Sequence, residues 1–126
     1  MRILTKEFSR LARKFGIDDE SLGTAIDDAD RGLIEADLGS HLIKQRIARK
    51  GAGKSGGYRI IIYYRRASRS VFLHIFAKKA KANLNAAELE AYRDFARILD
   101  DLTERQLLEL VDRRGWRVIQ DAEEGS

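Results

Sequence analysis

The chain has 126 residues, with 24 Lys and Arg against 20 Asp and Glu, and its formal net charge is +4 at neutral pH. This size and a hydrophobic content of 44% predict one globular domain. No apolar run approaches the roughly 20 residues of a membrane span, and the N-terminus lacks the apolar core of a signal peptide, so we expect a cytoplasmic protein. The absence of cysteine excludes disulfides, thiolate metal sites and cysteine nucleophiles, and two histidines argue against a dedicated metal site.

The first third of the chain predicts a short strand followed by a helical hairpin. Residues 2–4 can form the strand, and Thr5 is placed to cap a helix that ends at Gly16. A second helix begins near Asp18, where acidic residues suit the positive helix end, and closes near Gly32. Both helices carry apolar residues at helical spacing, so we expect the hairpin to cover one face of a sheet.

The middle of the chain changes to the alternating pattern of β-strands. In the strand that starts at Leu42, Lys44 and Arg46 share one face while apolar residues alternate with them. Further along, runs of branched, aromatic and other apolar residues predict buried strands at 58–64 and 71–77, with a glycine-rich connection at 51–57 and a polar hairpin at 65–70. Three consecutive strands with short connections predict an antiparallel meander.

The last third predicts two more helices. Asn85 and Thr103 are each followed three residues later by Glu or Gln, which is the pattern of a capping box. Gly115 suits the end of the second of these helices, and residues 116–120 favour an edge strand. The elements together predict an α+β fold, with a small antiparallel sheet of three to four strands, the helical hairpin on one face, and C-terminal helices.

The positive charge is concentrated in one stretch. From Leu38 to Ala87 the chain carries twelve Lys and Arg and no Asp or Glu, so the rest of the chain is net negative. Each Lys or Arg that neutralises a phosphate releases counterions, and a block of this kind therefore favours nucleic acid as the partner. The alternative is a basic surface that solubilises the fold or pairs with the acidic flanks.

The glycine-rich sequence GAGKSGG at 51–57 invites comparison with a nucleotide-binding phosphate loop. The first glycine of that motif would fall at Ala48, and a strand follows instead of a helix, so the comparison fails. The stretch is better interpreted as a flexible connection whose backbone amides, together with Lys54 and Ser55, come close to a polyanion.

Antiparallel pairing would gather cations that are distant in the sequence. Arg59 begins one strand, and Lys78 and Lys79 follow the next, so these ends should lie together, with Lys44 and Arg46 completing the patch. Such a cluster can bind phosphate, and it can lower the pKa of one lysine, which makes a neutral amine available as a base. The alternative for Arg59 alone is a solvent-exposed arginine at a strand end.

The remaining candidates favour structural roles. His74 lies mid-strand and is interpreted as a hydrogen-bonded core histidine, not a general base, and His41 as a surface residue. The basic block holds no pair of carboxylates, which argues against two-acid hydrolysis and carboxylate-bound magnesium there. Aromatic residues that could stack on bases, but that are more typical of a core, are Tyr58, Tyr63, Tyr64 and Trp116.

The order of elements and two motifs, KSGGYR at Lys54–Arg59 and FAKK at Phe76–Lys79, resemble the RelE/ParE superfamily of type II bacterial toxins, and most closely its RelE/HigB-like branch. The likeness spans most of residues 1–100, so one toxin domain is expected over 1–126, with 101–126 as a helical extension. The resemblance implies a cytoplasmic, cofactor-free and metal-free ribonuclease that cleaves mRNA, in many members only on the ribosome. It also implies a cognate antitoxin as partner.

The resemblance assigns roles to individual residues. Lys44 and Arg46 match a basic pair that would act as base or hold the phosphate, and Arg59 would stabilise the transition state. Lys79 occupies the position of a further catalytic arginine, whereas the tyrosine that assists the substrate in the best-known members would fall near Asn85. RNA or phosphate contacts are expected from Lys50, Lys54, Ser55, Lys78, Lys81 and Asn85.

Two other functions stay open at this point. A ParE-like inhibitor of DNA gyrase would share the scaffold, because fold alone does not fix activity. A nonenzymatic RNA-binding module would keep a salt-dependent affinity for RNA without cleaving it.

Overall fold

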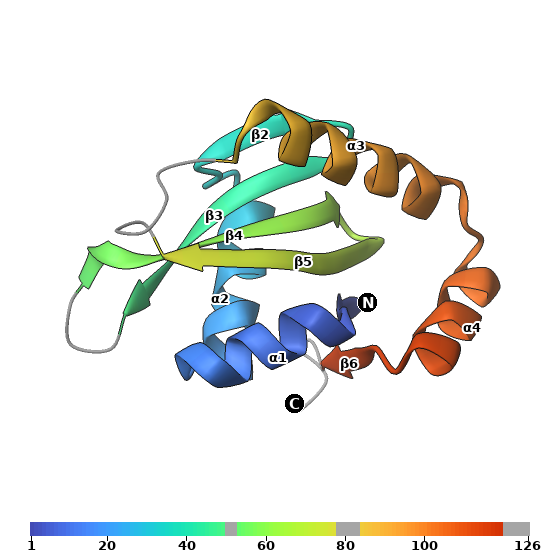
Figure 1. The fold of residues 1–126 in the computed structure, drawn as a ribbon, viewed down its shortest axis with the longest axis horizontal. Coiled ribbons are helices and arrows are strands. Elements are labelled where there is room, and N and C mark those ends of the chain that lie inside the picture. Colours follow the sequence, from blue (N-terminus) through green and yellow to red (C-terminus); the bar gives the residue numbers. More distant parts are fainter. Residues whose placement is uncertain (50–52, 78–83, 120–126) are drawn as a thin grey trace.

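The computed structural model describes residues 1–49, 53–77 and 84–119, with the backbone alone for residue 49 and residues 53–56. This part of the chain forms six strands and four helices (Figure 1). The strands are β1 Arg2–Leu4, β2 Ala36–Gly39, β3 Leu42–Arg49, β4 Gly53–Arg65, β5 Arg69–Ala77 and β6 Arg117–Ile119. The helices are α1 Lys6–Phe15, α2 Asp19–Asp30, α3 Ala86–Asp101 and α4 Glu104–Arg114.

The strands form one mixed sheet in the order β2-β3-β4-β5-β1-β6. The predicted α+β class and the antiparallel meander of β3, β4 and β5 are confirmed. The predicted size of three to four antiparallel strands is too small, because β1 pairs in parallel with β5 and the short β2 and β6 extend the two edges. The short strands predicted at 2–4 and 116–120 are present as β1 and β6, whereas β2, with four residues, carries too little alternation to be recognised from sequence.

The glycine-rich stretch is partly strand. Because β4 begins at Gly53, the predicted flexible connection is wrong for residues 53–57. Arg49 pairs with Gly53 across a register shift, so the β3–β4 ladder continues beyond the apolar part of both strands. Backbone hydrogen bonds need no side chains, which explains how glycines can lie in this ladder.

Helices pack on both faces of the sheet (Figure 1). On one face α1 and α2 enclose a core with buried residues of β3, β4 and β5, which confirms the predicted hairpin. On the other face α3 and α4 cover a second core. Representative buried residues are Phe8, Leu22, Ile60 and Phe72 in the first core, and Ile61, Tyr63, Leu99 and Leu107 in the second.

The helix ends use the caps that the sequence predicts. Thr5 and Asp18 accept a hydrogen bond from the backbone at the starts of α1 and α2. Asn85 and Thr103 form complete capping boxes. Gly115, with φ of 69°, ends α4 in the left-handed conformation. No helix in the described ranges is long and apolar enough to cross a bilayer.

A register shift between Ile61 and Ile62 changes which way β5 side chains point. Ile61 pairs with His74, but Ile62 pairs with Phe72, so Leu73 is an extra residue in β5. Phe72 therefore belongs to the core under α1, whereas Leu73 belongs to the core under α3. Simple alternation along the strand would predict His74 and Phe72 on the same face, and the extra residue makes that prediction wrong.

Candidate functional site

The centre of the candidate site is a pair of arginines on neighbouring strands. Arg46 of β3 and Arg59 of β4 are directly opposite each other in the register, and Phe76 of β5 is next in the same row. Paired residues of adjacent strands point to the same face, so the two guanidinium groups lie side by side on the face that α3 covers. The predicted convergence of these two residues is confirmed.

Arg59 is buried, with 2% of its surface exposed. The alternative of a solvent-exposed arginine at a strand end is therefore wrong. A buried guanidinium cannot be hydrated, and it therefore needs a compensating anion nearby. The partner is Glu35, whose Oε1 accepts a hydrogen bond from Arg59 Nε at 3.0 Å.

Glu35 bridges the two arginines. The same Oε1 also accepts a hydrogen bond from Arg46 Nε at 2.8 Å, so one carboxylate oxygen is shared by two guanidinium groups. Within the described part of the chain, Glu35 Oε2 and the terminal nitrogens of Arg46 make no hydrogen bond to another residue. The cluster of two arginines and one carboxylate keeps a net charge of +1 and has donors left for an anion.

Sequence reasoning missed Glu35. The residue lies three positions before the basic block that begins at Leu38, in a segment without a strand or helix pattern. The need for an acid could be inferred from the arginines alone. Two arginines that face each other in a sheet repel, and one of them is buried, so a carboxylate from another segment must lie close to them. Its position in the sequence could not be deduced from that requirement.

Gln45 holds the backbone that presents Glu35. Its carboxamide is buried, with 4% of the residue exposed, and Oε1 accepts a hydrogen bond from the backbone N–H of Glu35 at 3.0 Å. Its Nε2 donates to the carbonyls of Leu33 at 2.9 Å and Ala25 at 3.0 Å. Consecutive strand residues point to opposite faces, so Gln45 fixes the main chain of Glu35 while Arg46 fixes its side chain.

A hollow of about 480 Å³ opens beside this cluster. Leu33 and Ile34 on its wall are exposed by 60% and 37%, so the hollow has an apolar side next to the charged groups. The hollow is lined by Asp28, Gly32, Leu33, Ile34, Glu35, Gln45 and Arg46.

The other predicted site residues divide into two groups. Lys44 is half-buried on the same face as Arg46, one row away, opposite Ile61. Asn85 caps α3, with its Oδ1 accepting a hydrogen bond from Glu88 N at 2.8 Å. Lys50, Lys78, Lys79 and Lys81 lie outside the described residues, as do the side chains of Lys54 and Ser55, so their roles remain predictions.

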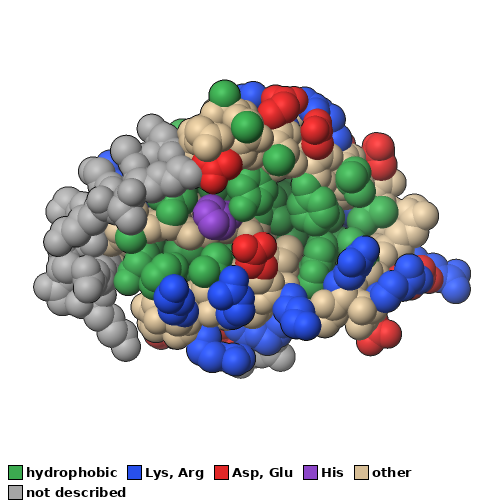
Figure 2. Space-filling view, viewed as in Figure 1, with side chains coloured by type: hydrophobic (Ala, Val, Ile, Leu, Met, Phe, Trp, Pro, Cys, Tyr) green, Lys and Arg blue, Asp and Glu red, His purple; other side chains and the backbone are tan. Residues whose placement is uncertain are grey.

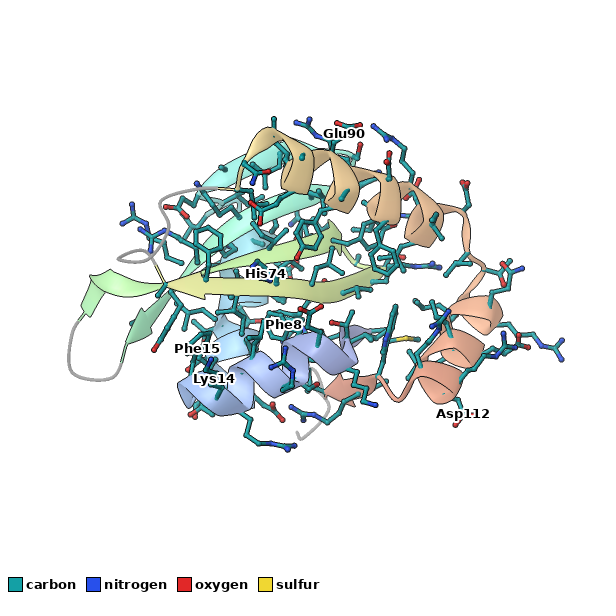
Figure 3. All side chains as sticks on the ribbon, viewed as in Figure 1. Phe8, Lys14, Phe15, His74, Glu90 and Asp112 are labelled. Carbon is teal, nitrogen blue, oxygen red and sulfur yellow. The ribbon has the colours of Figure 1, made fainter. Side chains whose placement is uncertain are left out.

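His74 lies on the same face, one row from Arg59. It is half-buried rather than buried, and its ring stacks on Tyr92 of α3 with centroids 5.7 Å apart. Figures 2 and 3 show it at the surface between α1 and α3, among apolar side chains. Burial, together with Glu7 and Glu88, raises the pKa of Tyr92 to about 12, so this neighbour is neutral at physiological pH.

The other predicted aromatic and histidine candidates have structural roles. Tyr63 is buried and donates a hydrogen bond from its hydroxyl to Asp100 Oδ1 at 2.8 Å. Burial and then this carboxylate raise the pKa of Tyr63 to about 12. His41 is exposed, with Nε2 3.8 Å from the same carboxylate oxygen. The described residues contain no group of three or more His, Asp or Glu that could hold a metal ion.

Fold and site together define a small α+β protein whose sheet carries a carboxylate-bridged arginine pair suited to binding an anion. The chain matches the RelE toxin of the RelE/RelB toxin-antitoxin system over residues 1–118, and it therefore belongs to this toxin family. No curated protein matches the chain. The predicted superfamily is thus confirmed, while its HigB-like branch stays a prediction. Membership of the family implies a cognate antitoxin as partner.

Proposed function

We propose that this toxin is a metal-independent endoribonuclease that cleaves mRNA on the ribosome in the cytoplasm. The observation that carries the proposal is the arginine pair bridged by Glu35, because phosphate-ester cleavage needs cations for the developing negative charge and a group that accepts a proton. Ribosome dependence and the mRNA substrate rest on the resemblance to RelE-like toxins.

The proposed reaction is attack of a ribose 2′-hydroxyl on the adjacent phosphorus. A bond from the 2′-oxygen to phosphorus forms, the bond from phosphorus to the 5′-oxygen breaks, and the products are a 2′,3′-cyclic phosphate and a 5′-hydroxyl. Arg46 and Arg59 stabilise the negative charge of the phosphorane. The leaving 5′-oxygen takes a proton from a nearby acid, for which Lys44 and Lys79 are the candidates.

Glu35 is the proposed proton acceptor. Arg46, which the resemblance offered as base or phosphate ligand, has hydrogen-bond donors and no acceptor, so it is suited to holding the phosphate and not to accepting a proton. When phosphate oxygens take the guanidinium donors, the carboxylate of Glu35 loses ion-pair partners and can accept the 2′-hydroxyl proton. Its Oε2 makes no hydrogen bond to another described residue, so we assign the proton transfer to this oxygen.

The test is to induce the toxin in a translation extract and to map new RNA 5′ ends. Arg46→Gln is the first variant, because 44% of the Arg46 side chain is exposed and its removal should leave the fold intact. We expect cleavage to fall by about 100-fold or more, as for the loss of a charge-stabilising donor. Arg97→Gln removes an arginine of similar exposure on α3, which is 55%, and should cleave like the wild type.

Other outcomes point to other functions. Intact transcripts combined with arrested DNA supercoiling would identify a gyrase inhibitor of the ParE type. RNA binding without new 5′ ends in either the wild type or the variant would identify a nonenzymatic RNA-binding protein.

A further inference from the structure

A second basic surface lies on α1, outside the basic block of the sequence. Lys6, Arg10, Arg13 and Lys14 are all exposed and recur at intervals of three and four residues, so they share the outer side of the helix. Figure 2 shows Lys and Arg side chains gathered along this side of the molecule, and Figure 3 labels Lys14 at its end. The row extends over about 12 Å, from a rise of about 1.5 Å per residue.

These four cations have no carboxylate partner among the described residues, in contrast to several exposed arginines elsewhere. Arg97, for example, is 2.6 Å from Asp94, and Arg117 is 2.8 Å from Asp19. The acid of α1, Glu7, raises the pKa of Tyr92 and so lies on the side that faces α3. The basic row on α1 is therefore unneutralised within the described chain.

Like charges are crowded along this face of the helix. Arg10 has like charges at i−4, i+3 and i+4, namely Lys6, Arg13 and Lys14, against one acid, Glu7, at i−3. Arg13 and Lys14 suit the negative end of the helix dipole, whereas Lys6 lies in the first turn, where the dipole favours acids. A row of exposed cations without an internal carboxylate partner is available to an external partner of negative charge.

The chemistry of α1 identifies that partner as a phosphate backbone. The large apolar residues of α1, including Phe8, Leu11 and Phe15, pack into the core and are unavailable to a membrane or a protein partner. A membrane-surface helix needs exposed apolar anchors, and protein interfaces depend on buried aromatic or aliphatic anchors. A surface with charge and without such anchors is typical of backbone recognition in nucleic acids.

The row on α1 ends close to the strand that carries the candidate site. Phe15 stacks on Tyr58 with ring centroids 4.9 Å apart, and Lys14 Nζ lies 5.8 Å from the Phe15 ring. Tyr58 directly precedes Arg59, but consecutive strand residues point to opposite faces. RNA on α1 is therefore a different segment from the strand that the arginine pair would hold.

We propose that the exposed face of α1, formed by Lys6, Arg10, Arg13 and Lys14, binds the backbone of a structured RNA segment outside the cleavage site. The choice of RNA over DNA rests on the proposed function. The surface would hold the toxin on a folded RNA while the arginine pair acts on a separate strand.

The test measures binding of a fluorescein-labelled RNA duplex by fluorescence anisotropy at several salt concentrations. The duplex has about 20 base pairs, which is longer than the roughly 16 base pairs that a double-stranded-RNA-binding domain spans. The variant is Lys6→Gln/Arg10→Gln/Lys14→Gln, and the matched control is Arg66→Gln/Arg97→Gln/Arg105→Gln, which removes three exposed cations from the β4–β5 turn, α3 and α4. We expect the α1 variant to bind about tenfold or more weakly, with a salt slope smaller by about 3, since each duplex phosphate contact contributes about 0.9. The control should retain most of the affinity.

Each alternative result decides against the proposal. Wild-type affinity in the α1 variant, or equal losses in the variant and the control, would show that α1 has no special part in binding. A loss confined to anionic vesicles, to antitoxin or to a DNA duplex would assign the face to that partner instead. Thermal melting of the α1 variant is measured beside that of the wild type, and an equal melting temperature shows that weaker binding does not reflect unfolding. Binding is measured without cleavage, so an inactive wild-type toxin would refute the proposed function and leave this result standing.

Discussion

Replacing Glu35 with Gln tests whether the carboxylate supports the fold at the arginine pair. The side chain of Arg59 is 3% exposed and that of Glu35 is 20% exposed, so the substitution leaves a buried guanidinium without its anion. Breaking a fully buried ion pair in this way costs about 3–5 kcal/mol. Arg46 is 44% exposed and can be screened by water, so we expect a smaller loss of about 2–3 kcal/mol.

The loss converts to a melting temperature through the unfolding entropy. At about 2.1 cal/mol/K per residue, a domain of 126 residues changes its melting temperature by about 4 °C for each kcal/mol, so Glu35→Gln should melt about 8–12 °C lower. Urea denaturation gives the free energy directly. Glu90→Gln is the control, since Glu90 is 55% exposed, its arginine contacts are 3.5 and 3.6 Å long, and its loss should cost less than about 0.5 kcal/mol (Figure 3).

Two further measurements separate this cause from a general defect. Arg59→Met in the Glu35→Gln background should recover much of the stability, because the unpaired charge is then absent. Inorganic phosphate should raise the melting temperature of Glu35→Gln more than that of the wild type, since an added anion can take the place of the carboxylate. If Glu35→Gln melts within about 2 °C of the wild type, the carboxylate does not compensate the buried charge and the reasoning is wrong.

Two predictions concern pH. Two hydrogen bonds of 2.8 Å from Arg117 lower the pKa of Asp19 below its usual 3.8. The ionised carboxylate therefore stabilises the folded protein above pH 3.8, and this contribution is lost as the pH falls through the pKa of the folded state. Asp19→Asn should therefore cost up to about 1 kcal/mol in urea denaturation at neutral pH, and equal stability of the variant and the wild type at pH 7 would contradict this. Burial raises the pKa of Tyr63 and Tyr64 from 10.0 to about 12, so stability should fall as pH rises from 10 through 12 together with the tyrosinate absorbance. The stability of Tyr63→Phe should fall less steeply over this pH range than that of the wild type. Equal slopes for the two proteins would argue that ionisation of Tyr63 is not the cause.

Elements with strong local signals could be predicted from the sequence. The capping boxes at Asn85 and Thr103 need residues three positions apart, and the strands β4 and β5 are indicated by runs of branched and aromatic residues within one segment. The facing of Arg46 and Arg59 followed from antiparallel pairing of neighbouring strands, which is also a local relation.

The parts that escaped prediction depend on contacts between distant segments. Parallel pairing of β1 with β5 joins residues about 70 positions apart, and β6 then adds to β1 from the other end of the chain. The bulge at Leu73 reverses the direction of Phe72 without any change in apolar character. Glu35 reaches the arginines because Gln45 holds its backbone, and no sequence pattern connects these residues.

The arginine pair has a carboxylate partner within the protein and the row of cations on α1 has none in the described residues, and burial explains the difference. Arg59 is buried and cannot be hydrated, so the chain must supply an acid, and Glu35 keeps the arginine pair side by side before any substrate arrives. The cations of α1 are hydrated, so they can remain unpaired within the described chain at a cost of a few tenths of a kcal/mol for each like-charge pair. A phosphate at the arginine pair must compete with a carboxylate, which favours a ligand placed with the right geometry, whereas phosphates at α1 compete with water and salt alone. The buried pair is therefore suited to selecting one phosphate for chemistry, and the exposed row to holding a polyanion of any sequence.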